Sequence, residues 1–172
     1  MSKEFEAATA AKMLSNALMT SGKVLSVAES ITGGLIGVLI TDIPGSSKIF
    51  WGSLVTYSDA SKQKILGIKK DTIHTYSAVS KEVVELMAEN ALKLSKSDIS
   101  LAVSGYAGGN DDSTEDIGLV WIAVKLNKGT VFSHKFNFTG SRDLIRHKTA
   151  IQGFLFAETV LRQPERLDSC SF

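Results

Sequence analysis

A strand-like run that leads through a glycine turn into a second apolar run is the most restrictive feature of this sequence. Val24–Ala28 is apolar and β-prone, the turn after it contains Gly33 and Gly34, and Leu35–Ile40 is apolar again. This succession predicts a buried strand, a tight polar turn and a buried helix. A strand joined directly to a helix is typical of sheets that helices cover, so the run favours an α/β fold.

The rest of the chain continues the alternation of helices and strands. Helical spacing or a capping residue predicts helices at Lys3–Thr20, after Ser58, after Ser80 and over Ser141–Leu161. β-prone runs predict strands at Trp51–Tyr57, Ile99–Ser104, Leu119–Leu126 and Val131–Phe138, of which the last two form a hairpin. We therefore predict one three-layer α/β/α domain with a mixed β-sheet. It spans residues 1–163, and residues 164–172, which lack a periodic pattern, form a flexible C-terminal tail.

The turn Pro44–Ser47 precedes the predicted strand Trp51–Tyr57. Serine is a good N-cap, because its hydroxyl accepts a hydrogen bond from a backbone N–H in the first helical turn. We therefore expect Ser46 or Ser47 to cap any helix that follows this turn.

Charge and cysteine content exclude several classes of protein. The chain has 19 Lys and Arg against 18 Asp and Glu, and this near balance argues against a dedicated nucleic-acid-binding protein. The single cysteine, Cys170, excludes an intramolecular disulfide and is typical of a reducing compartment. The longest apolar run, Leu35–Ile40, is far shorter than the roughly 20 residues of a membrane span, and the N-terminus lacks an apolar signal sequence. We expect a cytoplasmic protein that binds neither nucleic acid nor a membrane.

Ser30 lies where the predicted strand gives way to the glycine turn. Backbone amides converge at such a turn, and the helix dipole favours negative charge there. The position suits a nucleophile whose attack creates an oxyanion, or an anion-binding loop. The other interpretation is a serine N-cap beside two glycines that pack on the sheet, and these residues alone favour it.

A base that could activate Ser30 is not obvious from local motifs. None of the three histidines lies in a motif that marks a base or a metal ligand: His74, His134 and His147. Lys62 follows the strand Trp51–Tyr57, and a neutral lysine can act as a base toward serine. Neutrality requires a lowered pKa, from burial or from a neighbouring cation such as Lys64. For Lys62 considered by itself, a solvent-exposed lysine is the simpler interpretation.

Several short sequence motifs, which occur in a fixed order, favour a functional interpretation of Ser30 and Lys62. They are Ala28-Glu29-Ser30-x-Thr32-Gly33-Gly34, Pro44-Gly45-Ser46-Ser47, Val55-Thr56-Tyr57-Ser58 with Lys62, Leu66-Gly67-Ile68, Ala78-Val79-Ser80, Ala102-Val103-Ser104-Gly105-Tyr106-Ala107-Gly108 and Gly140-Ser141-Arg142-Asp143. Together they resemble the CinA C-terminal-domain family, from the first helix to Leu161. Stand-alone members of this family include nicotinamide-nucleotide amidohydrolases, and the chain is similar to that form.

The resemblance implies a reaction and its residues. It implies hydrolysis of the carboxamide of nicotinamide mononucleotide to nicotinic acid mononucleotide and ammonia, with neither a metal nor another cofactor. Ser30 resembles the family nucleophile and Lys62 its general base, and the turn Thr32-Gly33-Gly34 is expected to hold the oxyanion. The implied partner is a small pyridine nucleotide, and by analogy we expect a homo-oligomer.

Four further residues match family positions that line the substrate pocket: Ser47, Tyr57, Ser104 and Arg142. Arg142 or Arg146 would suit the nucleotide phosphate, because a guanidinium group binds two oxygens at once. Arg142 could equally be an exposed residue in the first turn of a helix, and Tyr57 an aromatic core residue at a strand end.

The segment Gly109–Asp116 departs from the family pattern. The family usually has Lys-Pro shortly before the next strand, whereas this chain has Glu115-Asp116 there, after two further aspartates. If the segment faces an anionic substrate, its acids oppose binding, and if it points outward the change matters little. The alternative function is therefore a non-catalytic or repurposed relative that binds a nucleotide-like ligand or a protein partner.

Overall fold

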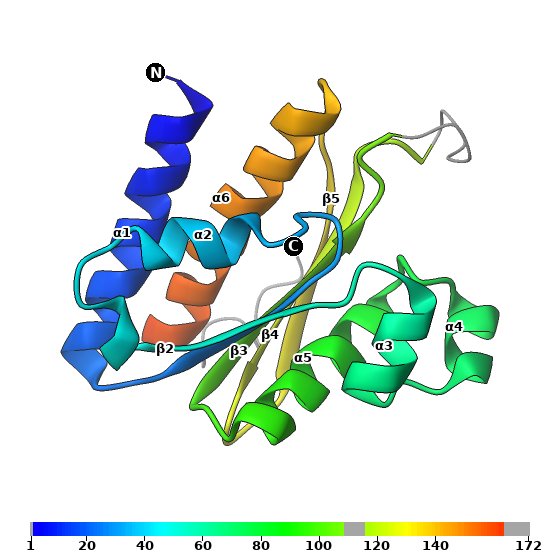
Figure 1. The fold of residues 1–172 in the computed structure, drawn as a ribbon, viewed down its shortest axis with the longest axis horizontal. Coiled ribbons are helices and arrows are strands. Elements are labelled where there is room, and N and C mark those ends of the chain that lie inside the picture. Colours follow the sequence, from blue (N-terminus) through cyan, green and yellow to red (C-terminus); the bar gives the residue numbers. More distant parts are fainter. Residues whose placement is uncertain (1, 109–115, 164–172) are drawn as a thin grey trace.

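The computed structural model describes residues 2–108 and 116–163 and contains a five-stranded mixed sheet with helices on both faces (Figure 1). The strands are β1 (Leu25–Glu29), β2 (Phe50–Val55), β3 (Ile99–Gly105), β4 (Leu119–Leu126) and β5 (Val131–Asn137). The helices are α1 (Lys3–Ser21), α2 (Leu35–Thr41), α3 (Asp59–Leu66), α4 (Lys70–Tyr76), α5 (Lys81–Ser95) and α6 (Arg142–Arg162), with a 3-10 turn η1 (Ser46–Lys48). The predicted three-layer α/β/α domain is confirmed.

The strand order β2-β1-β3-β4-β5 creates a crevice beside β1. β1 pairs in parallel with β2 on one side and with β3 on the other, so these three strands end at the same edge of the sheet. The helices that follow β1 and β2 cover opposite faces, because α2 packs with α1 and α6 whereas α3 packs against α5. Adjacent strands whose connections separate in this way leave a cleft at their carboxyl ends, which is the usual ligand site of α/β sheets.

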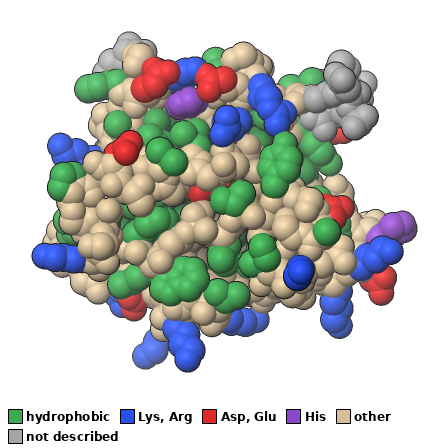
Figure 2. All heavy atoms as spheres, in the orientation of Figure 1, with side chains coloured by type: hydrophobic (Ala, Val, Ile, Leu, Met, Phe, Trp, Pro, Cys, Tyr) green, Lys and Arg blue, Asp and Glu red, His purple; other side chains and the backbone are tan. Residues whose placement is uncertain are grey.

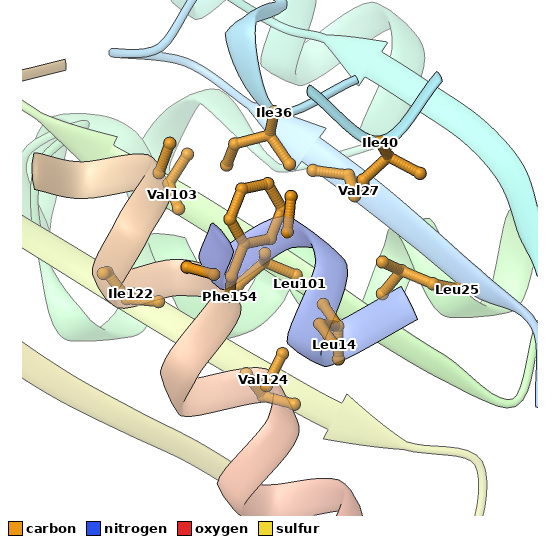
Figure 3. Packing of buried hydrophobic residues seen from close by; sticks show 14 of the residues in the cluster. Leu14, Leu25, Val27, Ile36, Ile40, Leu101, Val103, Ile122, Val124 and Phe154 are labelled. Atoms are coloured by element: carbon orange, nitrogen blue, oxygen red, sulfur yellow. The ribbon is translucent and has the colours of Figure 1, made fainter. Parts of the chain in front are cut away.

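The core is divided between the two faces of the sheet. On one face α1, α2 and α6 cover the larger cluster, in which the Phe154 ring lies among Ile36, Leu101 and Val103 (Figure 3). On the other face α5 buries Val84 and Met87 against the sheet. Both faces are covered, which explains why β1 and β3 are almost entirely buried, including the polar residues Ser26, Glu29 and Ser100.

Most predicted helix starts depend on local capping and are confirmed. Ser58, Ser80 and Ser141 each accept a hydrogen bond from the third residue of the helix that follows. The prediction for the turn at residues 44–47 was wrong, since Gly45 precedes η1 and no side chain caps it. The short helix α4 was not predicted, because Lys69 before it makes no capping bond and gives no start signal.

The helix α2 is less buried than its composition predicts. Only Ile36 and Ile40 are buried along it, and Val38 is exposed. The apolar run Leu35–Ile40 therefore presents one face to the core and another to the surface.

Three predictions concern residues outside the described ones: the tail 164–172, Cys170 within it, and the acidic segment 109–115. Within the described ranges, no helix combines the length and the apolar composition that crossing a membrane requires. On the face seen in Figure 2, hydrophobic and uncharged groups occupy the centre, and Lys and Arg lie mainly around the periphery.

Candidate active site

The crevice brings Ser30 and Lys62 together. Ser30 follows β1, Lys62 lies on α3 after β2, and the Ser30 Oγ to Lys62 Nζ distance is 3.0 Å. Lys62 Nζ also lies 3.0 Å from the carbonyl oxygen of Thr56 and 3.5 Å from that of Tyr57. An ammonium group at Lys62 donates to all three oxygens, whereas a neutral amine donates to the two carbonyls and has a lone pair left for the Ser30 proton.

Local capping places Lys62 at this point. Ser58 accepts from the Ser61 N–H, and the Ser61 hydroxyl accepts from the Ser58 N–H, which forms a capping box at the start of α3. Lys62 follows one residue later and turns its side chain inward, where it is 1% exposed. The expectation of a solvent-exposed lysine is therefore wrong for Lys62.

Burial is the main reason that Lys62 is a plausible base. Removing the ammonium group from water lowers the pKa of Lys62 below its ordinary value of 10.5, and the nearby Asp59 carboxylate opposes this only in part. Lys64, the other possible cause, has an exposed side chain on the same helix. The lowered pKa therefore follows from the position of Lys62 in the fold rather than from a neighbouring cation.

Replacing Lys62 with methionine is expected to change how stability depends on pH. Because the pKa of Lys62 is lowered on folding, the unfolded chain binds more protons than the folded protein between that pKa and 10.5. The free energy of unfolding should therefore rise with pH across this window, by at most about 1.4 kcal/mol per pH unit, and become level above it. The Lys62→Met protein should lack this rise.

Urea denaturation at a series of pH values measures the difference between the two proteins. Lys64→Met removes an exposed lysine from the same helix and should follow the wild type. A Lys62→Met curve that runs parallel to the wild type would show that Lys62 has the same pKa in the folded and unfolded chains.

A cavity of about 200 Å³ opens beside the two residues. Its wall includes Tyr57, Ser104 and Arg142, three of the residues that the family resemblance places at the substrate. Tyr57 is 60% exposed and accepts a hydrogen bond from Arg142 Nη2 at 2.9 Å, so it is not a core aromatic residue. Arg142 also donates to the carbonyl of Gly108. It is the first residue of α6 and is exposed, as the alternative interpretation expected, and it also lines the cavity.

The amides of Gly33 and Gly34, which were expected to hold the oxyanion, already have acceptors. The Gly33 N–H donates to the Ser30 carbonyl at 3.1 Å, and the Gly34 N–H donates to the Glu29 carboxylate at 3.0 Å. Neither glycine lines the cavity, and neither does Thr32, which is buried. The prediction of an oxyanion site at Thr32-Gly33-Gly34 is therefore corrected: the protein's own acceptors already occupy the amides of both glycines.

Glu29 is the functional residue that sequence reasoning missed. It is fully buried, and its two carboxylate oxygens accept four hydrogen bonds, from the N–H groups of Gly34, Ile36 and Gly37 and from the Ser53 hydroxyl. It thereby neutralises the N-terminus of α2, where Gly34 adopts a φ of +100°. A carboxylate directly before Ser30 and just ahead of a helix start is a signal that could have revealed this role.

Two predicted substrate residues lie away from the cavity. Arg146 donates to the Thr32 carbonyl at 2.6 Å, so it supports the turn after Ser30 instead of lining the cavity. Ser47 lies in η1 before β2, whereas Tyr57 follows the other end of that strand. At about 3.3 Å per residue, β2 places Ser47 at the opposite edge of the sheet within this chain.

The histidines take no part in this site. None of the cavity-lining residues is a histidine, and among residues 2–108 and 116–163 no three His, Cys, Asp or Glu side chains are grouped to hold a metal ion. Among the described residues that line the cavity, Ser30 and Lys62 supply a hydroxyl and an amine within hydrogen-bond reach of each other.

Comparison with known proteins identifies the family to which this chain is similar. The model for the CinA C-terminal domain matches residues 7–161. A CinA-like protein of Endomicrobium trichonymphae is 47% identical over 146 residues, which are 84% of this chain and 34% of that protein. A CinA-like protein of Petrotoga mobilis is 44% identical over 142 residues, 82% of this chain and 35% of that protein. The chain thus spans about a third of the length of these curated relatives.

Solved structures share the whole architecture. The competence/damage inducible protein CihA from Agrobacterium tumefaciens superposes with a TM-score of 0.87 at 33% identity, covering 92% of this chain and 96% of that one. A competence-damaged protein (CinA) superfamily protein from Klebsiella pneumoniae gives a TM-score of 0.86 at 26% identity, covering 91% and 98%.

Proposed function

Because the chain belongs to the CinA C-terminal domain family, we propose that it hydrolyses the carboxamide of nicotinamide mononucleotide to nicotinic acid mononucleotide and ammonia. The observation that carries the proposal is the 3.0 Å separation of Ser30 Oγ and Lys62 Nζ in a cavity. A nucleophile and a base within hydrogen-bond reach are what acyl transfer requires.

The first half of the reaction forms an ester on Ser30. Ser30 Oγ attacks the carboxamide carbon while its proton passes to Lys62 Nζ, and the carbonyl oxygen becomes an oxyanion. The C–N bond then breaks, Lys62 returns the proton to the departing nitrogen, and ammonia leaves. Water next gives a proton to Lys62 and attacks the ester carbon, and Ser30 recovers its proton as the carboxylic acid product departs.

The Ile31 N–H is our proposed oxyanion donor in place of the glycines. Ile31 follows the nucleophile, lines the cavity, and its N–H has no hydrogen-bond acceptor in the described part of the chain. The amide after the nucleophile has this role in other serine hydrolases. One such donor contributes about 3–4 kcal/mol to transition-state binding in related chemistry.

Arg142 is the group that we assign to the substrate phosphate. It lines the cavity, and within the described residues two of its donor groups are engaged, by Tyr57 Oη and by the Gly108 carbonyl. A guanidinium group has five N–H donors, so several remain for phosphate oxygens.

Incubation of the purified protein with nicotinamide mononucleotide tests the proposal. We expect ammonia and nicotinic acid mononucleotide in equal amounts, with the same yield in the presence of a metal chelator. Tight binding by calorimetry without either product would contradict the proposal and favour a non-catalytic relative. The segment Gly109–Asp116 suggests that alternative, and its residues 109–115 lie outside the described ones.

The pH dependence of kcat/KM should report the proton on Lys62. Lys62 must be unprotonated to accept from Ser30, so activity is present above its pKa and is lost as pH falls through it. Because burial lowers this pKa, the midpoint should lie below 10.5. Rates measured between about pH 5 and about pH 10 define the profile. Lys64→Met should leave the midpoint unchanged, and a midpoint at the ordinary lysine value would contradict the assignment of Lys62 as the base.

A further inference from the structure

An unpartnered carboxylate lies in the wall of the cavity. Among the residues that the structure describes, the charged side chains lining the cavity are Asp59, Lys62 and Arg142. Lys62 Nζ contacts Ser30 Oγ and the carbonyls of Thr56 and Tyr57, and Arg142 donates to Tyr57 and Gly108. Asp59 makes no hydrogen bond or ion pair with any residue that the structure describes. Among the described residues the cavity thus holds one guanidinium group, that of Arg142, and one carboxylate, that of Asp59, which no described side chain pairs with.

The fold does not require this carboxylate. Asp59 is the first residue of α3, and the helix is already capped by the reciprocal bonds of Ser58 and Ser61. An acid in the first turn interacts favourably with the helix dipole, but this effect is small for an exposed side chain. Asp59 is exposed, so its carboxylate can meet a ligand that enters the cavity.

Two aromatic rings in the same wall are held in place by their hydroxyl groups. Tyr57 Oη accepts from Arg142, and Tyr106 Oη lies 3.2 Å from the Ser77 hydroxyl. Tethered rings lose little freedom when a ligand binds against them, and an aromatic face attracts a cation.

We propose that Asp59, with the rings of Tyr57 and Tyr106, makes this site selective for a carboxamide carried on a positively charged aromatic ring. The inference rests on the proposed function and adds a specificity-determining residue to it. In nicotinamide mononucleotide the ring that bears the carboxamide is a pyridinium cation. Once the carboxamide carbon is at Ser30 Oγ, the ring must occupy the same cavity, close to the unpaired carboxylate.

The reduced form of the nucleotide provides a matched probe. Dihydronicotinamide mononucleotide has the same carboxamide, ribose and phosphate, but its ring is uncharged. Binding of both forms is measured by calorimetry in the Ser30→Ala protein, so that chemistry does not intervene. We expect the oxidised form to bind about tenfold more tightly than the reduced form.

Asp59→Asn, added to Ser30→Ala, should bring this ratio of affinities close to one. The variant should bind the oxidised nucleotide more weakly and the reduced nucleotide as tightly as before. The control is Asp71→Asn, which removes an exposed first-turn carboxylate from α4, outside the cavity. It should preserve the tenfold ratio.

Two outcomes separate failure of this inference from failure of the proposed function. If the wild type releases ammonia but Asp59→Asn keeps the full binding ratio, the role of Asp59 is wrong and the function stands. If the wild type neither binds nor hydrolyses either form, the proposed function and the role of Asp59 are both wrong.

Discussion

Replacing Ser30 with alanine is expected to lower kcat for ammonia release from nicotinamide mononucleotide by about 10⁴- to 10⁶-fold. The substitution removes the oxygen that forms the ester, and Lys62 has no other hydroxyl within hydrogen-bond reach among the described residues. Lys62→Met should have a comparable effect, because it leaves Ser30 without a proton acceptor. Rates are measured by ammonia release, with circular dichroism to show that each protein is folded.

The double variant makes this prediction sharper. Residues that act as one catalytic unit are not additive, so Ser30→Ala with Lys62→Met should be no slower than either single variant. Lys64→Met should keep wild-type activity, since its side chain is exposed on the same helix. A double variant whose loss equals the product of the two single losses would show that Ser30 and Lys62 act independently.

Replacing Glu29 with alanine is expected to lower the free energy of unfolding by about 3–5 kcal/mol. The change deprives three backbone N–H groups and the Ser53 hydroxyl of their acceptor at a fully buried position. Glu29→Gln should lose less, about 2 kcal/mol, because its amide retains one accepting oxygen. Urea denaturation at equilibrium measures both losses.

Glu82 provides the matched control for this measurement. It is also an acid in the first turn of a helix, α5, but its side chain is exposed. Glu82→Ala should change the free energy of unfolding by no more than about 0.5 kcal/mol. Equal losses at Glu29 and Glu82 would show that the buried carboxylate does not hold α2 and β2 to β1.

Local signals made most of the fold predictable. Ser58, Ser80 and Ser141 are followed by amphipathic runs, and each caps a helix through bonds that span only three residues. The helix α4 has no such signal, since its start at Lys69 is uncapped. Strand order was not predictable, because pairing between β1 and β3 joins residues more than seventy positions apart.

The candidate site was predictable only in part. Ser30 and Lys62 are unremarkable one at a time, and the ordered family strings singled them out before their proximity was known. The error at Gly33 and Gly34 arose because a glycine turn indicates where amides converge but not which acceptor already binds them. Glu29 binds Gly34, and the Ser30 carbonyl binds Gly33. The same sequence pattern is therefore compatible with a free or with a filled anion site.

The oxygen atoms that accept hydrogen bonds from Lys62 limit what substitutions can do to this site. They are main-chain oxygens of Thr56 and Tyr57, and every amino acid carries such an oxygen. No single substitution at either position can delete an acceptor. Single substitutions can therefore change the exposed side chains around the cavity, including the ring of Tyr57, while Lys62 Nζ keeps its two main-chain acceptors. Substitutions at the rim of the cavity can thus change which ligands it admits while the main-chain contacts of Lys62 persist.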